Sequence, residues 1–172
     1  MNQISWIDGQ WVTAEECTIP ICDRGLKFAD GIFETILIYN GKTKLLEEHI
    51  NRWQKSAQIL GMKKPPEKSW LEPLIQEGIQ KLSLNKNHGA LRLNWSRGNC
   101  YSRNISANIS EYSDVKNRFW LEISHIIPCF DEISAIISNN EKRNANSRLS
   151  QCKSFAYGQS IQARIEAEMQ GY

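Results

Sequence analysis

Four basic side chains stand out as able to do chemistry: one amine, Lys153, and three guanidiniums, Arg52, Arg97 and Arg103. A neutral lysine amine is a nucleophile toward a carbonyl carbon and, when free again, a base. The planar fork of arginine matches the oxygens of a phosphate or a carboxylate better than a lysine does. Taken singly, each such charge is most often a solvated surface group, so the interpretation depends on the segments that contain them.

Metal chemistry has no support in the sequence. The histidines (His49, His88 and His125) show no ligand spacing. The five cysteines are odd in number and include no Cys-x-x-Cys pair, which favours reduced thiols in the cytoplasm over disulfides or a zinc site. We therefore expect no metal and a cytoplasmic protein.

The bulk composition excludes several classes of partner. The chain has 172 residues, 41% hydrophobic and 23% charged, with a formal net charge of +2. That charge is too small to predict nucleic-acid binding. The first residues lack the basic and apolar regions of a secretory signal, and no apolar run is long enough for a membrane span. We expect a soluble globular protein with neither nucleic acid nor membrane as partner.

Two tight hairpins open the chain. Asp8-Gly9 and Asn40-Gly41 are the residue pairs that a type I′ turn prefers, because both turn positions need positive φ. The first pair lies within residues 4–11, and the second joins a β-branched strand over 32–39 to a return strand over 42–46.

Helices and further strands follow. Apolar spacings of three and four predict one helix from residue 47 to Gly61 and another over 69–85. Residues 90–96 alternate between apolar and polar side chains, which predicts a half-buried strand. We expect a loop over 101–117, strands over 119–127 and 133–138, and a last helix over 155–169. Strands joined by hairpins predict an α+β fold, an antiparallel sheet with helices packed on one face.

Three segments, in order, resemble the class IV aminotransferases, the fold type IV enzymes that use pyridoxal phosphate. The first contains Asp23-Arg24-Gly25 and Gly31-Ile32-Phe33-Glu34-Thr35 and runs to Arg52. The second is the strand 91–98, which ends in Ser96-Arg97-Gly98. The third is 149–155, around Lys153. Together they span nearly the whole chain.

The resemblance implies a role for each basic residue. Lys153 would hold pyridoxal phosphate covalently and then act as the base that transfers protons. Arg52 would pair with the cofactor phosphate. Arg97, and Arg103 in the loop after it, would hold a carboxylate of a small amino-acid-like substrate. The family's sites are usually built in homodimers, so a homodimer is expected.

The resemblance also predicts the organisation of the chain. Residues 1–138 would form the N-terminal α+β domain, and 139–172 an interdomain loop and the start of a C-terminal cofactor domain. The family has a second domain after its lysine, whereas this chain stops at Tyr172. We therefore expect a truncated form that lacks a complete site and exposes apolar surface.

Among its relatives, the chain is most similar to the 4-amino-4-deoxychorismate lyases, which release pyruvate and 4-aminobenzoate for folate synthesis. Residues 99–103 depart from the glycine-rich run that those lyases often have after Ser-Arg-Gly. A branched-chain or D-amino-acid transaminase is therefore the alternative enzyme. A non-catalytic α+β module that binds a partner through its bare face is the alternative of another class.

Overall fold

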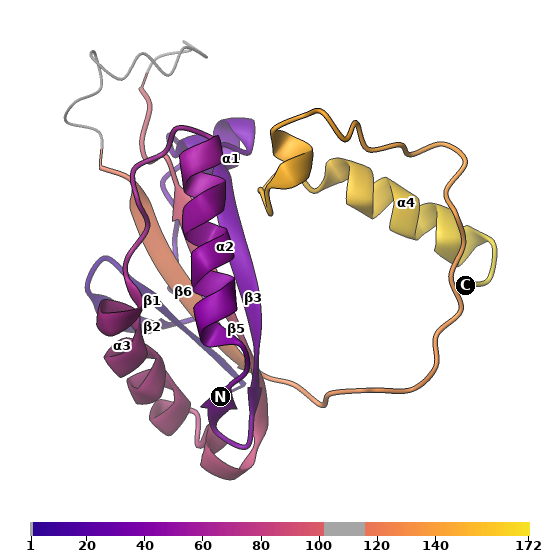
Figure 1. The fold of residues 1–172 in the computed structure, drawn as a ribbon. Helices are drawn as coiled ribbons and strands as arrows, with labels where there is room; N and C mark the ends of the chain where they lie inside the picture. The colour runs from indigo at the N-terminus through magenta and orange to yellow at the C-terminus, as the bar shows by residue number, and fades with distance from the viewer. Residues whose placement is uncertain (1, 102–115) are drawn as a thin grey trace.

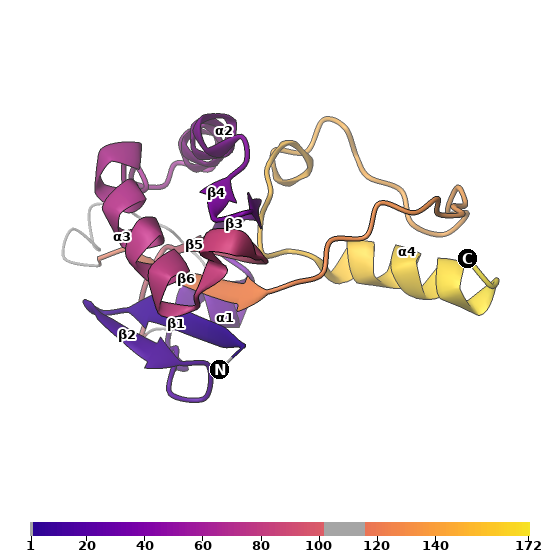
Figure 2. The same cartoon turned by 90° about the horizontal axis from the view of Figure 1, so that it is seen from below.

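One six-stranded antiparallel sheet organises the protein in a computed structural model, which describes residues 2–101 and 116–172. The strand order is β2-β1-β6-β5-β3-β4, and helices α2 and α3 cover one face (Figures 1 and 2). This confirms the predicted α+β fold. The strands are β1 (Gln3–Ile7), β2 (Gln10–Thr13), β3 (Gly31–Tyr39), β4 (Lys42–Thr43), β5 (His88–Ser96) and β6 (Arg118–His125). The helices are α1 (Arg24–Phe28), α2 (Leu46–Ile59), α3 (Lys68–Lys81) and α4 (Gly158–Met169), with 3₁₀ turns at Leu84–Lys86 and Leu149–Gln151.

Both predicted hairpin turns are present. Asp8 and Gly9 have φ values of 49° and 92°, and Asn40 and Gly41 have values of 49° and 72°. All four residues thus adopt the positive φ that a type I′ turn requires. The turns fix the pairing of β1 with β2 and of β3 with β4.

The hydrophobic core lies between the sheet and the helices α2 and α3. On α2, Ile50, Trp53 and Ala57 are buried, as the helical spacing predicted. Trp53 is completely buried and contacts the rings of Trp95 and Phe119. Burial of this apolar surface supplies most of the fold's stability.

A short helix, α1, lies just before β3. The Asp23 carboxylate accepts a hydrogen bond of 2.7 Å from the backbone N–H of Gly25 and caps the helix. The second oxygen of the same carboxylate accepts a bond from Ser96. The Asp-Arg-Gly motif therefore joins α1 to the end of β5.

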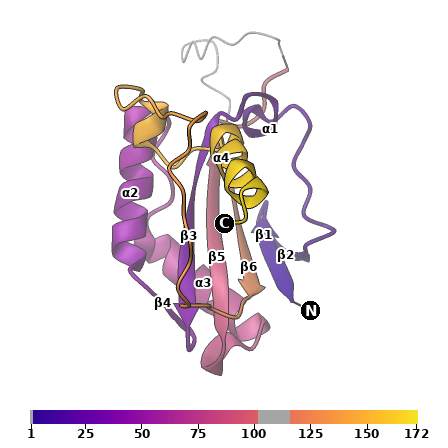
Figure 3. The same cartoon turned by 90° about the vertical axis from the view of Figure 1, so that its right-hand side faces the viewer.

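The predicted strand at residues 133–138 is wrong, because that segment has no regular structure and pairs with no described strand. Its side chains Ile133 and Ile137 are 89% and 93% exposed. The last helix starts at Gly158 rather than at 155, and it lies on the side of the sheet away from α2 and α3 (Figures 1 and 3). In the described ranges, no helix has the length and apolarity that crossing a bilayer needs.

Candidate active site

The segment around Lys153 extends the sheet at the free edge of β3. The N–H of Phe33 donates to the carbonyl of Lys153 over 2.9 Å, and the N–H of Phe155 donates to the carbonyl of Gly31 over 2.9 Å. This edge is open because β4 pairs only with Ile38 and Tyr39, at the far end of β3. An unpaired strand edge offers a row of N–H and C=O groups, so it holds the Lys153 backbone in place.

Close packing at Gly31 accompanies this pairing. A Cβ atom at Gly31 would stand 2.2 Å from the Phe155 ring. Such a distance is far inside van der Waals contact, so only glycine lets the Phe155 ring reach the strand. The Gly-Ile-Phe-Glu-Thr motif and the lysine segment thus fit against each other directly.

The Lys153 side chain lies among aromatic groups. Its Nζ is 4.5 Å from the centre of the Phe33 ring, and it donates a 3.1 Å hydrogen bond to the Tyr157 hydroxyl. Within the described part of the chain, no carboxylate forms an ion pair with this amine. A ligand that reaches this amine therefore has no ion-pair partner to displace.

Arg52 is held by a carboxylate that the sequence analysis did not single out. Its Nε and Nη2 donate to the two oxygens of Glu34 over 2.6 and 2.5 Å. The Glu34 side chain is completely buried, whereas that of Arg52 is 55% exposed. These hydrogen bonds raise the pKa of Arg52 above its ordinary value. Nη1 forms no bond in the ranges that the structure describes.

His49 completes this cluster, with its Nδ1 2.8 Å from Glu34. A signal for Glu34 was present in the sequence. Ile32, Ile36 and Ile38 point to the same side of β3 and are fully buried, so an acid in that alternating stripe requires a buried cationic or hydrogen-bonding partner.

Arg97 is occupied by structural bonds. Its Nε contacts Asp30 at 2.9 Å, and its other two nitrogens donate to the carbonyls of Leu60 and Gly61. This arrangement ties the end of β5 to the end of α2. A carboxylate-binding role for Arg97 stays a prediction, and Arg103 lies outside the described residues.

A cavity of about 350 Å³ lies beside the lysine segment, over the polar side of β5 and β6. Arg92 lines it and stacks on Phe33, with its guanidinium carbon 3.6 Å from the ring centre. Burial lowers the pKa of Arg92 from its ordinary value. Asn94 accepts from Arg92 and donates to Glu122. The alternation on β5 predicted this polar side, but only the fold shows that Asn94 on it is buried and Arg92 partly buried.

Metal ligation finds no support within residues 2–101 and 116–172, where no cluster of His, Cys, Asp and Glu could hold an ion. Lys153 offers an amine beside Phe33 and Tyr157, and Arg52 offers a guanidinium beside Glu34 and His49; that the two bind one ligand stays a prediction. An amine and a guanidinium are the groups that a carbonyl-bearing phosphate compound such as pyridoxal phosphate would require.

Comparison with solved structures shows a shared fold. The chain superimposes on a hypothetical aminotransferase from Mycobacterium tuberculosis in its PLP-bound form, with a TM-score of 0.78 and 21% identity, over 99% of this chain and 60% of that one. A 4-amino-4-deoxychorismate lyase from Pseudomonas aeruginosa gives a TM-score of 0.69 at 20% identity, over 94% and 56% of the two chains. At such identities the likeness shows the fold alone.

Sequence comparison shows the family. The family model described as "Amino-transferase class IV" matches residues 31–172. A D-alanine aminotransferase of Bacillus licheniformis is 32% identical over 113 residues, which cover 62% of this chain and 38% of that protein. Another from Listeria monocytogenes is 33% identical over 92 residues, which cover 54% and 31%.

The fold is thus that of the N-terminal domain of the fold type IV pyridoxal-phosphate enzymes. The chain belongs to the class IV aminotransferase family. It spans about a third of the length of these curated relatives and about 60% of the Mycobacterium structure. These curated relatives are D-alanine aminotransferases rather than the predicted lyases, so they favour the alternative enzyme of the sequence analysis.

Proposed function

We propose that this chain is a portion of a pyridoxal-phosphate-dependent aminotransferase that acts on D-amino acids. The proposal rests on one observation above all: the backbone of Lys153 is hydrogen-bonded to the edge of β3, beside Phe33 and Tyr157. The named relatives support the D-amino-acid substrate class.

Each residue has a definite task in this proposal. Pyridoxal phosphate, when bound, withdraws electrons from the substrate carbon that loses its proton. The Lys153 amine holds the cofactor, and when free it takes a proton from the substrate Cα and returns one. The Phe33 ring and the Tyr157 hydroxyl orient that amine. Arg52, held by Glu34 through Nε and Nη2, would bind the cofactor phosphate with its remaining nitrogen, Nη1.

In this proposal, Glu34 is a positioning residue for Arg52. Two hydrogen bonds to a buried carboxylate restrict the guanidinium to one orientation, which reduces the entropy lost when a phosphate binds. A homodimer, as expected for the family, is part of the proposal.

Covalent labelling tests the role of Lys153. The 172-residue chain is mixed with pyridoxal phosphate, reduced with borohydride and mapped by peptide mass spectrometry. We expect the label at Lys153 at a cofactor concentration that leaves the exposed Lys55 unlabelled. Equal labelling of both lysines would refute the assignment.

The same labelling reports on Arg52. Its replacement, Arg52→Gln, should raise the pyridoxal phosphate concentration needed for half-labelling by roughly tenfold, because a charge-assisted hydrogen bond is lost. Labelling by pyridoxal, which has no phosphate, should not change. Lys55→Gln, on the same helix, is the matched control. A loss of labelling by both compounds would indicate a structural role for Arg52.

The substrate class is tested in a chain that also carries the second domain of its relatives. A D-amino-acid transaminase converts D-alanine and a 2-oxo acid into pyruvate and a new amino acid. A 4-amino-4-deoxychorismate lyase would instead release pyruvate with 4-aminobenzoate. Formation of 4-aminobenzoate without amino transfer would overturn the proposed substrate class in favour of the lyase.

A further inference from the structure

Two cysteines far apart in the sequence, Cys22 and Cys100, lie opposite each other where the segment before α1 meets the segment after β5. Asp23 and Asn99 form an isolated antiparallel bridge there. Beside that bridge, the N–H of Cys100 donates to the carbonyl of Cys22 over 2.8 Å. The antiparallel register therefore opposes the two cysteines, and residues opposed in this way project their side chains to the same side.

The two backbones are close enough for a disulfide bond. Given the 2.8 Å hydrogen bond between the Cys100 nitrogen and the Cys22 oxygen, standard bond lengths leave the two Cα atoms at most about 6.7 Å apart. Disulfides join residues whose Cα atoms are about 4.4–6.8 Å apart. Both residues carry a thiol in this structure, so the pairing geometry is present before the bond forms.

The Cys100 side chain lies beside a guanidinium. Burial acts to lower the pKa of Arg24, but hydrogen bonds with Asp30 and with the Cys100 side chain act the other way, and that pKa lies above its ordinary value. A neighbouring arginine stabilises a thiolate, which is the form of cysteine that attacks a disulfide. Because Arg24 is only two residues from Cys22, this contact also directs the Cys100 side chain toward the segment that contains Cys22.

The two thiols differ in exposure. Cys100 is buried, with 1% of its surface exposed, whereas Cys22 is partly exposed. A small disulfide in solution therefore reaches Cys22 first, and Cys100 is placed to attack from inside the protein. An accessible thiol next to a second, resolving cysteine is the usual arrangement of a redox-sensitive pair.

From these observations we propose that Cys22 and Cys100 form a reversible disulfide by exchange with a small disulfide such as oxidised glutathione. In the first step the Cys22 thiolate attacks one glutathione sulfur, and one glutathione leaves as a thiol with the proton that Cys22 lost. In the second step the Cys100 thiolate attacks the Cys22 sulfur, and the second glutathione leaves with the proton from Cys100. Two electrons thus pass from the two cysteines to glutathione.

The bond fixes one wall of the cavity beside Arg92. Asp23, Gly25 and Leu26 line that cavity, and they follow Cys22 directly in the chain. Separation of α1 from the end of β5 is prevented by the crosslink, so local unfolding of this segment becomes rarer. Neither the bond nor this effect depends on the proposed function.

Disulfide mapping tests the proposal. The 172-residue chain is equilibrated under native conditions with oxidised glutathione, the remaining thiols are blocked with iodoacetamide, and unreduced peptides are analysed by mass spectrometry. We expect a peptide pair joined through Cys22 and Cys100, and an excess of reduced glutathione should separate it again.

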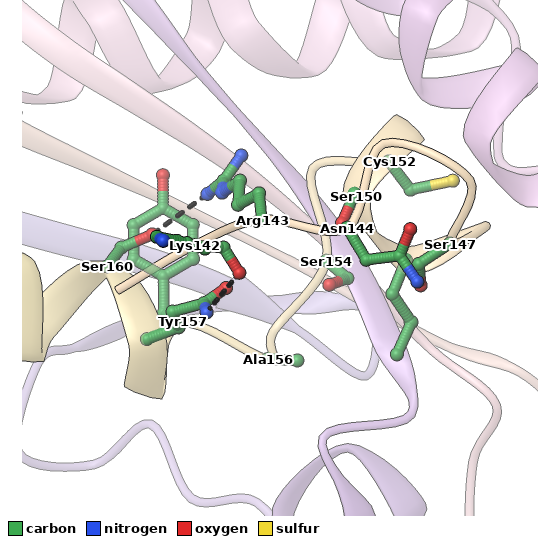
Figure 4. A pocket seen from close by; sticks show the side chains of 12 residues that line it. Lys142, Arg143, Asn144, Ser147, Ser150, Cys152, Ser154, Ala156, Tyr157 and Ser160 are labelled. Atoms are coloured by element: carbon green, nitrogen blue, oxygen red, sulfur yellow. Dashed lines mark hydrogen bonds between the residues drawn. The ribbon is translucent and has the colours of Figure 1, made fainter. Parts of the chain in front are cut away.

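Two other cysteines are controls in the same experiment. Cys129 is exposed and should keep a single glutathione. Cys152 lines a pocket between the loop 142–150 and the start of α4, and none of the other described residues that line this pocket is a cysteine (Figure 4). A glutathione that reacts with Cys152 should therefore also stay attached.

Single variants separate the roles of the two thiols. Cys100→Ser should leave glutathione on Cys22, because no resolving thiol remains. Cys22→Ser should leave Cys100 without glutathione, since that thiol is buried. In the oxidised chain, exchange of the Arg24 and Cys100 amides, which donate across the bridge, should slow by roughly tenfold or more. Cys129→Ser is the matched control and should show the same slowing.

Absence of the peptide pair that joins Cys22 to Cys100, in a native chain whose Cys129 carries glutathione, would overturn the proposal. Crosslinks from Cys17 in equal yield would also overturn it, because they would show random pairing. Both outcomes are measured on the unmodified sequence, so neither depends on a variant that folds. If the crosslink forms while pyridoxal phosphate does not label Lys153, the proposed function fails and the disulfide remains.

Discussion

The sheet with α2 and α3 and the segment 126–172 are built in opposite ways. In the sheet, apolar side chains from strands and helices meet in one core, where Ile36, Trp53 and Leu91 are fully buried. In the C-terminal segment, Ile127 and Ile137 are 95% and 93% exposed, and α4 has no buried residue. The C-terminal segment is held to the sheet mainly by backbone hydrogen bonds, above all those between residues 153–155 and β3.

This difference shows that periodicity places side chains on one side of an element but does not supply a partner for them. Helix α2 and helix α4 both carry apolar residues at helical spacing. Only the apolar side chains of α2 are buried against the sheet, whereas α4 buries none of its own. Hydrophobic stabilisation is proportional to the apolar area removed from water. The apolar residues of α2 therefore stabilise the fold more than those of α4, although both sets recur at helical spacing.

The largest expected effect is on the free energy of unfolding, when one isoleucine is replaced in each region. Ile36→Ala should lower the free energy of unfolding by about 2–5 kcal/mol, because Ile36 is fully buried and the change leaves a cavity. Ile137→Ala should change it by less than about 0.5 kcal/mol. Urea denaturation followed by tryptophan fluorescence measures both. Similar losses would show that the C-terminal segment is packed in solution.

A smaller effect is expected at the junction between the regions. Gly31→Ala places a methyl group against the Phe155 ring and should cost about 1–3 kcal/mol of local stability. This loss of local stability should appear in hydrogen exchange as faster exchange of the Phe33 amide, which donates to the Lys153 carbonyl. Gly158→Ala is the control, since no atom lies within 4 Å of the added carbon. Unchanged protection of Phe33 would contradict the pairing.

The smallest effect concerns two thiols of the C-terminal segment. Burial raises the pKa of Cys152 above its ordinary value, whereas Cys129 is exposed. The thiolate is the reactive form, so Cys152 should be alkylated by iodoacetamide more slowly than Cys129 at neutral pH. Mass spectrometry of the two peptides gives the rates. In the Gly31→Ala variant the Cys152 rate should rise toward that of Cys129.

Local patterns predicted much of the sheet region. The Asp8-Gly9 and Asn40-Gly41 pairs predicted their turns because positive φ is a property of single residues. The apolar stripe of α2 predicted its buried side, because there the helical period and the tertiary contact agree. Residues 133–138 failed as a strand because strand formation needs a neighbouring edge, which sequence alternation does not reveal.

The sequence by itself determined the fold class, the hairpins, the resemblance to class IV aminotransferases and the choice of Lys153 and Arg52 as candidates. Only the tertiary structure decided what surrounds them: the free edge of β3 for Lys153, buried Glu34 for Arg52, and structural bonds for Arg97. The physical reason is how far along the chain the interactions that set each property extend. Backbone conformation and periodicity are local, whereas burial and hydrogen-bond partners depend on residues brought together from distant parts of the chain.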